Sequence, residues 1–162
     1  MRIRLAEERD CEGLRGLYRE LDADAVRHQP EHFVMCERTD AYLLERIRAQ
    51  DSDFIVAERD GRLLGFSLVS IKRAVPVSCL KPQVNAYIGD LVVAQGERGR
   101  GIGTALMEAS KRYGRERGAE FIRTQVFPGN EAGIRFYARN GFVEMMKTME
   151  CQFGGGDGRA AE

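Results

Sequence analysis

Residues 1–6 alternate between apolar and polar side chains, which predicts a short strand. A helix should follow, with Asp10 as its N-cap. The apolar stripe of this helix recurs at intervals of three or four residues: Leu14, Leu17, Tyr18 and Leu21. Pro30 then interrupts the pattern, because proline does not fit a helix interior. A second helix is expected from Thr39 to about Gln50.

Two runs rich in β-branched and aromatic residues flank the pair Asp60-Gly61 within the segment Phe54–Lys72. A two-residue turn of type I′ prefers such a pair, so this segment predicts a β-hairpin. A proline-containing loop separates the hairpin from the next predicted strand, Asn85–Val93.

A helix is predicted to begin at Ile102, directly after a glycine-rich turn, and Gly118 should end it. Apolar residues on one face of this helix follow the helical period: Ile102, Ala105, Leu106, Ala109 and Tyr113. The next strand is expected over Phe121–Phe127.

A short helix is predicted from the N-cap Asn130 to about Arg139, where Asn140-Gly141 should stop it. Phe142–Gln152 is the last predicted strand. Residues 154–162 offer little apolar surface to bury and are expected to be disordered.

The predicted order is β-α-α-β-β-β-α-β-α-β, with a hairpin in the first half and a strand–helix–strand crossover in the second. This order predicts an α/β protein with one mixed sheet and helices on both faces. The length of 162 residues is that of one domain, expected over residues 1–153.

The composition, with 43% hydrophobic and 31% charged residues, is ordinary for a globular protein. No apolar run approaches the roughly 20 residues that cross a bilayer, and the N-terminus lacks a signal-peptide pattern. We therefore expect a cytoplasmic protein with no membrane partner. Four cysteines are present without C-x-x-C spacing, so buried free thiols are expected.

The net charge is zero, which argues against broad nucleic-acid binding. The charge is unevenly distributed, however. Residues 1–60 carry 10 Lys/Arg and 15 Asp/Glu, whereas residues 61–162 carry 15 and 10. The first segment could attract a cation and the second an anion, or the split could arise by chance.

The turn from Arg98 to Gly103 contains three glycines and two arginines at the start of a predicted helix. Free backbone N–H groups at a helix start form a cradle for phosphate. The turn does not fit the Walker pattern, since Ile102 stands where lysine is required. It does not fit the dinucleotide pattern either, because Thr104 occupies the third glycine position.

Together, the segments DLVVAQGERGRGIGTALM and NEAGIRFYARNGF resemble the GNAT superfamily of acyl-CoA N-acyltransferases. Arg98-x-x-Gly101-x-Gly103 matches the pyrophosphate signature of that family. Asn130 and Tyr137 have the spacing of its second motif. The resemblance covers residues 85–145 and implies a mixed, mostly antiparallel, twisted sheet.

The resemblance also implies acetyl-CoA as co-substrate. Its diphosphate would bind backbone amides in the glycine-rich turn, and its pantetheine arm would pair with the preceding strand. A backbone N–H of that strand would stabilise the oxyanion. The residues assigned to the cofactor in this way are Leu91, Val92, Val93, Arg98, Gly99, Arg100, Gly101, Ile102, Gly103, Thr104 and Asn130.

Acyl transfer to an amine requires a base for the amine proton and an acid for the leaving thiolate. Tyr137 is the candidate acid by resemblance. Asp90 is the candidate base or amine-orienting group, since it interrupts an apolar strand before the cofactor segment, and a water chain could serve as base instead. Many family members carry glutamate one place earlier, where this chain has Gly89. Tyr87 and Glu144 are weaker alternatives.

His28 and His32 have the spacing of metal ligands on one helix, but Pro30 lies between them, so no metal is expected. The predicted function is transfer of an acetyl group from acetyl-CoA to a primary amine by direct attack. Transfer of a longer acyl group or to a protein N-terminus, acyl-CoA sensing without catalysis, and a plain interaction domain are the alternatives. Because family members often dimerise, a homodimer is left open.

Overall fold

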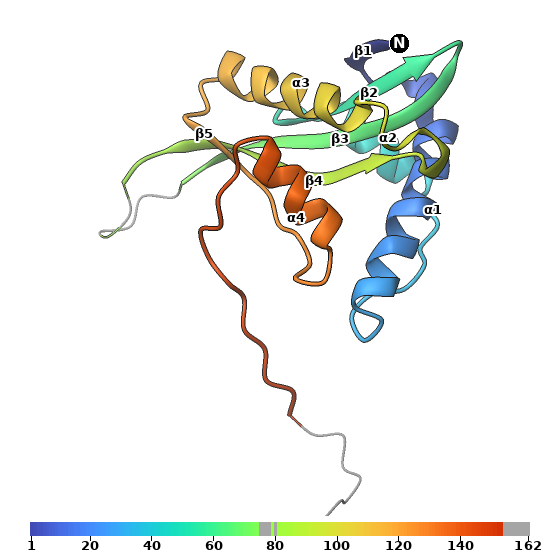
Figure 1. Cartoon of the computed structure of the whole chain (residues 1–162). Helices are drawn as coiled ribbons and strands as arrows, with labels where there is room; N and C mark the ends of the chain where they lie inside the picture. Colours follow the sequence, from blue (N-terminus) through green and yellow to red (C-terminus); the bar gives the residue numbers. More distant parts are fainter. Residues whose placement is uncertain (75–78, 80, 154–162) are drawn as a thin grey trace, which may run out of the picture.

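A computed structural model describes residues 1–74, 79 and 81–153 of the chain (Figure 1). The elements in chain order are β1 (Arg2–Leu5), η1 (Glu8–Asp10), α1 (Cys11–His28), α2 (Asp40–Ile47), β2 (Ser52–Arg59), β3 (Arg62–Arg73), β4 (Val84–Val93), η2 (Gln95–Glu97), α3 (Ile102–Glu116), β5 (Phe121–Arg123) and α4 (Glu131–Arg139).

Five strands form one mixed sheet in the order β1-β2-β3-β4-β5. Neighbours are antiparallel except β4 and β5, which are parallel because α3 crosses between them. The predicted hairpin is confirmed as β2–β3. Asp60 and Gly61 both have positive φ, 53° and 76°, as a type I′ turn requires.

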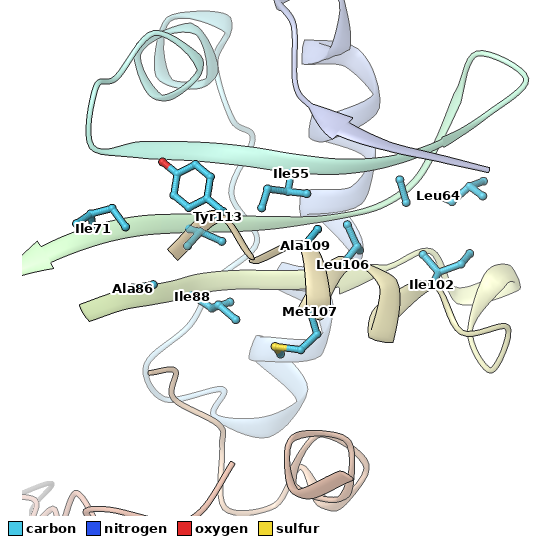
Figure 2. Packing of buried hydrophobic residues seen from close by; sticks show 12 residues of the cluster. Ile55, Leu64, Ile71, Ala86, Ile88, Ile102, Leu106, Met107, Ala109 and Tyr113 are labelled. Atoms are coloured by element: carbon cyan, nitrogen blue, oxygen red, sulfur yellow. The ribbon is translucent and has the colours of Figure 1, made fainter. Parts of the chain in front are cut away.

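Helix α3 covers one face of the sheet with the apolar stripe that the sequence predicts (Figure 2). Figure 2 shows the α3 side chains against those of the sheet, and the cluster includes Ile55, Leu64, Ile71, Ala86, Ile88, Ile102, Leu106, Met107, Ala109 and Tyr113. Gly118 follows the helix with φ 77°, a left-handed conformation that favours glycine and ends α3 as expected.

Helices α1 and α2 cover the opposite face, so the prediction of helices on both faces is confirmed. This second core is rich in aromatic rings, with Tyr18 of α1 against Phe54 and Phe66 of the sheet. Thr39 caps α2 by accepting a hydrogen bond from the Tyr42 N–H. The helix ends at Ile47, three residues earlier than predicted.

Two strand predictions in the C-terminal part are wrong. β5 stops at Arg123, not Phe127, and Phe142–Gln152 forms no strand. β5 is short because its pairing with β4 ends at Tyr87–Arg123. The segment after Gly141 has no strand of the same described chain beside it, and it runs away from the sheet (Figure 1).

Two smaller predictions also need correction. Asp10 precedes α1 but makes no side-chain capping bond, because its carboxylate binds the Arg4 guanidinium at 2.6 Å. The four cysteines are free, yet none is buried: Cys11 is half-buried, and Cys36, Cys79 and Cys151 are exposed. The predicted disordered segment 154–162 lies outside the described residues.

Candidate active site

Strands β4 and β5 pair at one end and separate at the other. Their ladder joins Asn85–Tyr87 to Phe121–Arg123, and no pair follows Tyr87–Arg123 in the described chain. The Thr124 hydroxyl donates to the Ile88 carbonyl at 3.1 Å, at the point where the strands part. From there to Val93, β4 pairs with β3 alone, so backbone groups on its other side face the opening.

A bulge in β4 lies beside this opening. Leu68 of β3 pairs with Asp90 and Val69 pairs with Ile88, so Gly89 is an extra residue without a partner. An extra residue of this kind bends a strand and redirects the side chains next to it. The bulge therefore sets the direction of Asp90, the predicted base.

The glycine-rich turn begins α3 as predicted. Gly99 and Gly101 have φ of 77° and 79°, which explains glycine at both positions. Gly103 is needed for packing, since an added Cβ would lie 3.2 Å from the Phe136 ring of α4. No side chain caps α3, and its first backbone bond runs from the Ala105 N–H to the Gly101 carbonyl.

The amides of residues 102–104 precede that first bond and have no partner within the helix. Their N–H groups and the positive end of the helix dipole favour an anion. The arrangement resembles a phosphate cradle, and no side chain makes a capping hydrogen bond at this helix start.

Arg98 and Asn130, from the two sequence motifs, line one pocket of about 320 Å³ between α1, the glycine-rich turn and the start of α4. Asn130 caps α4 by accepting from the Gly133 N–H at 2.8 Å. The Arg98 guanidinium donates to the Val93 carbonyl at 3.0 Å and contacts Asp24 of α1 at 3.1 Å. The structure thus brings both motifs to the end of β4.

Asp90 of β4 forms a hydrogen bond with a side chain of helix α1. The Tyr18 hydroxyl donates to Asp90 Oδ2 at 2.8 Å, and the Arg38 guanidinium lies over the Tyr18 ring at 4.6 Å. Burial raises the pKa of the Asp90 carboxyl above its usual range, and the Tyr18 hydrogen bond and the charges of Arg38 and Arg46 offset part of that effect. A proton-accepting carboxylate with a raised pKa suits a general base.

Tyr137 of α4 packs against Phe136 and Phe142, with ring centroids 5.4 Å apart in both pairs. Burial raises the pKa of the Tyr137 hydroxyl, a hydrogen bond with Thr124 lowers it in part, and the Asp90 charge raises it. Thr124 marks the point where β4 and β5 separate, so Tyr137 lies at the opening. At neutral pH its hydroxyl is a proton donor.

His28 and His32 contact different side chains. His28 stacks near Phe127 with centroids 5.6 Å apart, whereas His32 contacts Glu150 at 3.0 Å. Within the described residues, no cluster of three or more His, Cys, Asp or Glu side chains has the geometry of a metal site. In the same part of the chain, no helix is long and apolar enough to cross a membrane.

Sequence reasoning missed the partners of the predicted residues. Tyr18 was predicted as part of an apolar stripe, and its hydrogen bond to Asp90 spans 72 positions of the chain. Thr124 was predicted only as one position of a strand. The Asp24 contact with Arg98 had no local signal beyond the acidic first segment. Such contacts depend on tertiary packing that spacing along the chain does not encode.

A sheet opened between two parallel strands, with an uncapped glycine-rich helix start at the opening, defines an α/β protein of the acyl-CoA N-acyltransferase type. The profile of the Acetyltransferase (GNAT) family matches residues 10–142. The chain therefore belongs to the GNAT acetyltransferase family, and the resemblance found in the sequence is confirmed.

Similar proteins agree with this assignment. Streptothricin acetyltransferase of Streptomyces lavendulae is 36% identical over 95 residues, which cover 59% of this chain and 46% of that protein. A crystal structure of a mutant Bacillus halodurans protein superposes with a TM-score of 0.90 at 22% identity, covering 94% of this chain and 99% of that one.

An aminoglycoside N-acetyltransferase crystallised with CoA gives a TM-score of 0.71 at 22% identity, covering 94% of this chain and 99% of that one. At this level of identity, the two superpositions show a shared fold and do not bear on the activity of this chain. The chain spans about half the length of the curated relatives it matches.

Proposed function

We propose that this protein transfers an acetyl group from acetyl-CoA to a primary amine by direct attack, with both substrates bound at once. The observation that carries the proposal is the opening between β4 and β5, with Asp90 on one side and Tyr137 on the other. Both side chains can exchange protons. Each forms a hydrogen bond with a second hydroxyl group: Asp90 with Tyr18, and Tyr137 with Thr124.

The uncapped start of α3 fits the diphosphate of CoA. Backbone amides from Gly99 to Thr104 supply N–H donors, and Arg98 and Arg100 add positive charge. The pantetheine arm is suited to the free side of β4 over Leu91–Val93, where it can pair as an added strand. A solved neighbour that contains CoA supports the same co-substrate.

The reaction replaces a thioester C–S bond by an amide C–N bond, so the amine loses a proton and the sulfur gains one. An alkyl ammonium with a pKa near 10.4 is almost fully protonated at neutral pH and cannot attack. Asp90 accepts this proton, directly or through water. Its raised pKa makes it a better acceptor than an ordinary exposed carboxylate.

Tyr137 supplies the second proton. A thiol with a pKa near 8.5 is mostly protonated at neutral pH, so the departing thiolate takes up a proton, and a phenol is a suitable donor. A backbone N–H at Val92 or Val93, at the free edge of β4, would stabilise the oxyanion formed on the carbonyl carbon.

A cationic acceptor is favoured by the charges beside the opening. The carboxylates of Glu20 and Asp24 lie on the part of α1 that faces the glycine-rich turn, at the Gln95 N–H and the Arg98 guanidinium. Asp90 adds a third carboxylate. Relatives named for streptothricin and aminoglycoside acetylation support small amine substrates.

The proposal is tested by Tyr137→Phe, assayed by CoA release with a library of amines. We expect kcat to fall by roughly 10²-fold or more, with the Kd for CoA unchanged, because the substitution removes only the proton-donating hydroxyl and keeps the ring. The matched control adds Phe136→Tyr to the Tyr137→Phe variant. This double variant keeps a tyrosine on α4 at the neighbouring position, and it should not regain the rate. An active Tyr137→Phe enzyme would remove Tyr137 from the mechanism. A native protein that binds CoA but turns over no amine would be an acyl-CoA sensor.

A further inference from the structure

Asp90 faces the side of the sheet that α1 and α2 cover. Its partner across the ladder is Leu68, which belongs to the core under α1 and α2, whereas Ile88 pairs with Val69 in the core under α3. Paired residues of neighbouring strands share a face of the sheet. The bulge at Gly89 therefore turns Asp90 away from the face that Ile88 occupies and toward α1.

Tyr18 of α1 meets Asp90 on that face through its hydroxyl, which donates to Asp90 Oδ2 at 2.8 Å. The Tyr18 side chain is only 1% exposed, and its ring packs against Phe54 and Phe66. A phenylalanine ring would fill the same space, so packing alone does not require the hydroxyl. A buried hydroxyl needs a hydrogen-bond partner, and here that partner is the candidate base.

The two oxygens of the Asp90 carboxylate differ in their surroundings. Oδ2 accepts the Tyr18 hydroxyl, whereas no group in the described part of the chain donates to Oδ1. A carboxylate that is fixed through one oxygen keeps a defined orientation and still has acceptor capacity at the other. Oδ1 is therefore the atom at which an amine, or a water molecule that carries its proton, can bind.

Other ionisable side chains also face Asp90 from five parts of the chain: Asp22 of α1, Arg38 between α1 and α2, Arg46 of α2, Tyr87 of β4 and Tyr137 of α4. The charges of Arg38 and Arg46 favour the ionised carboxylate, and the charge of Asp22 opposes it. Arg38 donates two hydrogen bonds to Asp22, at 2.7 and 2.8 Å, so part of its charge is balanced there.

The Tyr18 hydrogen bond counteracts the effect of burial on Asp90. Burial raises the pKa of the carboxyl, and the bond from Tyr18 lowers it more strongly than the charges of Arg38 and Arg46 do. Without this bond, more of the carboxyl would be protonated, and a protonated carboxyl accepts no proton from an amine. Burial and the charge of Asp90 raise the pKa of Tyr18 itself, so its hydroxyl stays a donor.

We propose that Tyr18 is a positioning residue for acetyl transfer, which holds Asp90 by Oδ2 so that Oδ1 receives the proton of the amine. This inference rests on the proposed function, because it takes Asp90 as the base. As the C–N bond forms and the C–S bond breaks, the amine proton passes to Oδ1, directly or through water, and the sulfur takes its proton from Tyr137. Tyr18 keeps its own proton and acts through Asp90.

The first test follows the titration of Asp90 by NMR in protein with isotope-labelled aspartate, where the Asp90 signal is identified by its absence in Asp90→Asn. Tyr18→Phe should raise the midpoint of this titration by about one pH unit, because the hydrogen bond is lost while the burial stays. Tyr113→Phe is the matched control, since it removes another buried tyrosine hydroxyl, on α3 at the opposite face. It should leave the midpoint unchanged.

The second test measures kcat/KM against pH in the same variants. In Tyr18→Phe, the acidic limb of the profile should move upward by the same amount as the titration midpoint. Above that limb, kcat should fall roughly tenfold with the Kd for CoA unchanged, because the orientation of Asp90 is lost. In an Asp90→Asn background, Tyr18→Phe should reduce the rate no further. A further tenfold loss there would overturn the proposal, since Tyr18 would then act independently of Asp90.

A fluorinated tyrosine at position 18 is a second variant, which keeps both the ring and the hydroxyl. Its phenol is more acidic and a stronger donor, so the midpoint should fall, opposite to the change in Tyr18→Phe. A midpoint that neither variant moves would overturn this inference alone, because the titration requires no turnover. A midpoint that moves while the acidic limb stays in place would show that Asp90 is not the base. That result would overturn the proposed mechanism and this inference together.

Discussion

Helices α3 and α4 pack on the same apolar cluster, yet they are buried to very different extents. α3 contributes seven buried residues, among them Leu106 at 0% exposure, whereas α4 contributes none and Ile134 is 42% exposed. The strands differ in a similar way: β2, β3 and β4 carry buried residues, whereas the two edge strands, β1 and β5, carry none.

This difference in burial divides the protein into a well-packed scaffold and a second region with few buried side chains. The scaffold, β2–β4 with α1–α3, supplies Asp90 and the glycine-rich turn. The second region, β5 with α4, supplies Tyr137 and faces the opening. Regions with few buried apolar contacts open at low free-energy cost, which suits a site that must admit a long cofactor. The candidate reaction takes place where the two regions meet.

The largest effect is expected at the scaffold side of that junction. Asp90→Asn should reduce kcat/KM by about 10²- to 10⁴-fold, because a general base is lost while its size is kept. In the native enzyme, activity should fall below a pH that lies above the usual carboxylate range, since protonation of Asp90 removes the base. Asp53→Asn, on the opposite face, is the control and should retain activity. An unchanged rate in Asp90→Asn would remove Asp90 from the mechanism.

The stability of the two regions can be compared with one pair of substitutions. Leu106→Ala should lower the free energy of unfolding by about 2–5 kcal/mol, because it leaves a cavity in a closed core. Ile134→Ala should cost less than about 1 kcal/mol, since its side chain is partly in water already. Both are measured by urea unfolding of the single variants against the native protein. Equal losses would contradict the distinction between the regions.

Burial of the Asp90 carboxylate should lower the stability of the folded protein at neutral pH. Its folded-state pKa is raised, so the folded protein binds this proton more tightly than the unfolded chain does. Stability attributable to Asp90 is therefore lost as the pH rises from the unfolded to the folded pKa. Asp90→Asn should raise the melting temperature at pH 7, and the gain should disappear below the unfolded pKa, near pH 4. A lower melting temperature at pH 7 would contradict this cause.

The smallest effect is expected at the glycine-rich turn. Asp24 pairs with Arg98 across a partly exposed contact. In the proposed complex it would compete with the phosphate for that guanidinium. Asp24→Asn should therefore tighten CoA binding by about two- to fivefold in calorimetry. Glu131 lines the same pocket, so Glu131→Gln controls for the general loss of negative charge. If both variants tighten binding equally, the Arg98 contact is not the cause.

Local signals in the sequence predicted most of this architecture. Asp60-Gly61 predicted the hairpin because the turn depends on its own two residues. Asn130 predicted the start of α4 for the same reason. Phe142–Gln152 has the composition of a strand but forms none, although β5 pairs with β4 alone among the described residues and so has a free edge. Composition therefore does not determine whether a segment pairs.

The candidate site was predictable to a lesser extent. The glycine-rich turn could be found because its candidate ligand-binding groups are consecutive backbone amides. The direction and surroundings of Asp90 could not, since they depend on a bulge at Gly89 and on Tyr18 from another layer. The separation of β4 and β5 likewise arises from the sheet as a whole.

The central claim is that backbone amides from Gly99 to Thr104 hold the diphosphate of CoA and so direct the thioester into the opening between β4 and β5. A crystal structure of the protein with CoA tests this most directly. We expect diphosphate oxygens within about 3.2 Å of those amides, and the sulfur between Asp90 and Tyr137. A diphosphate bound away from the start of α3, or a sulfur outside the opening, would contradict the account.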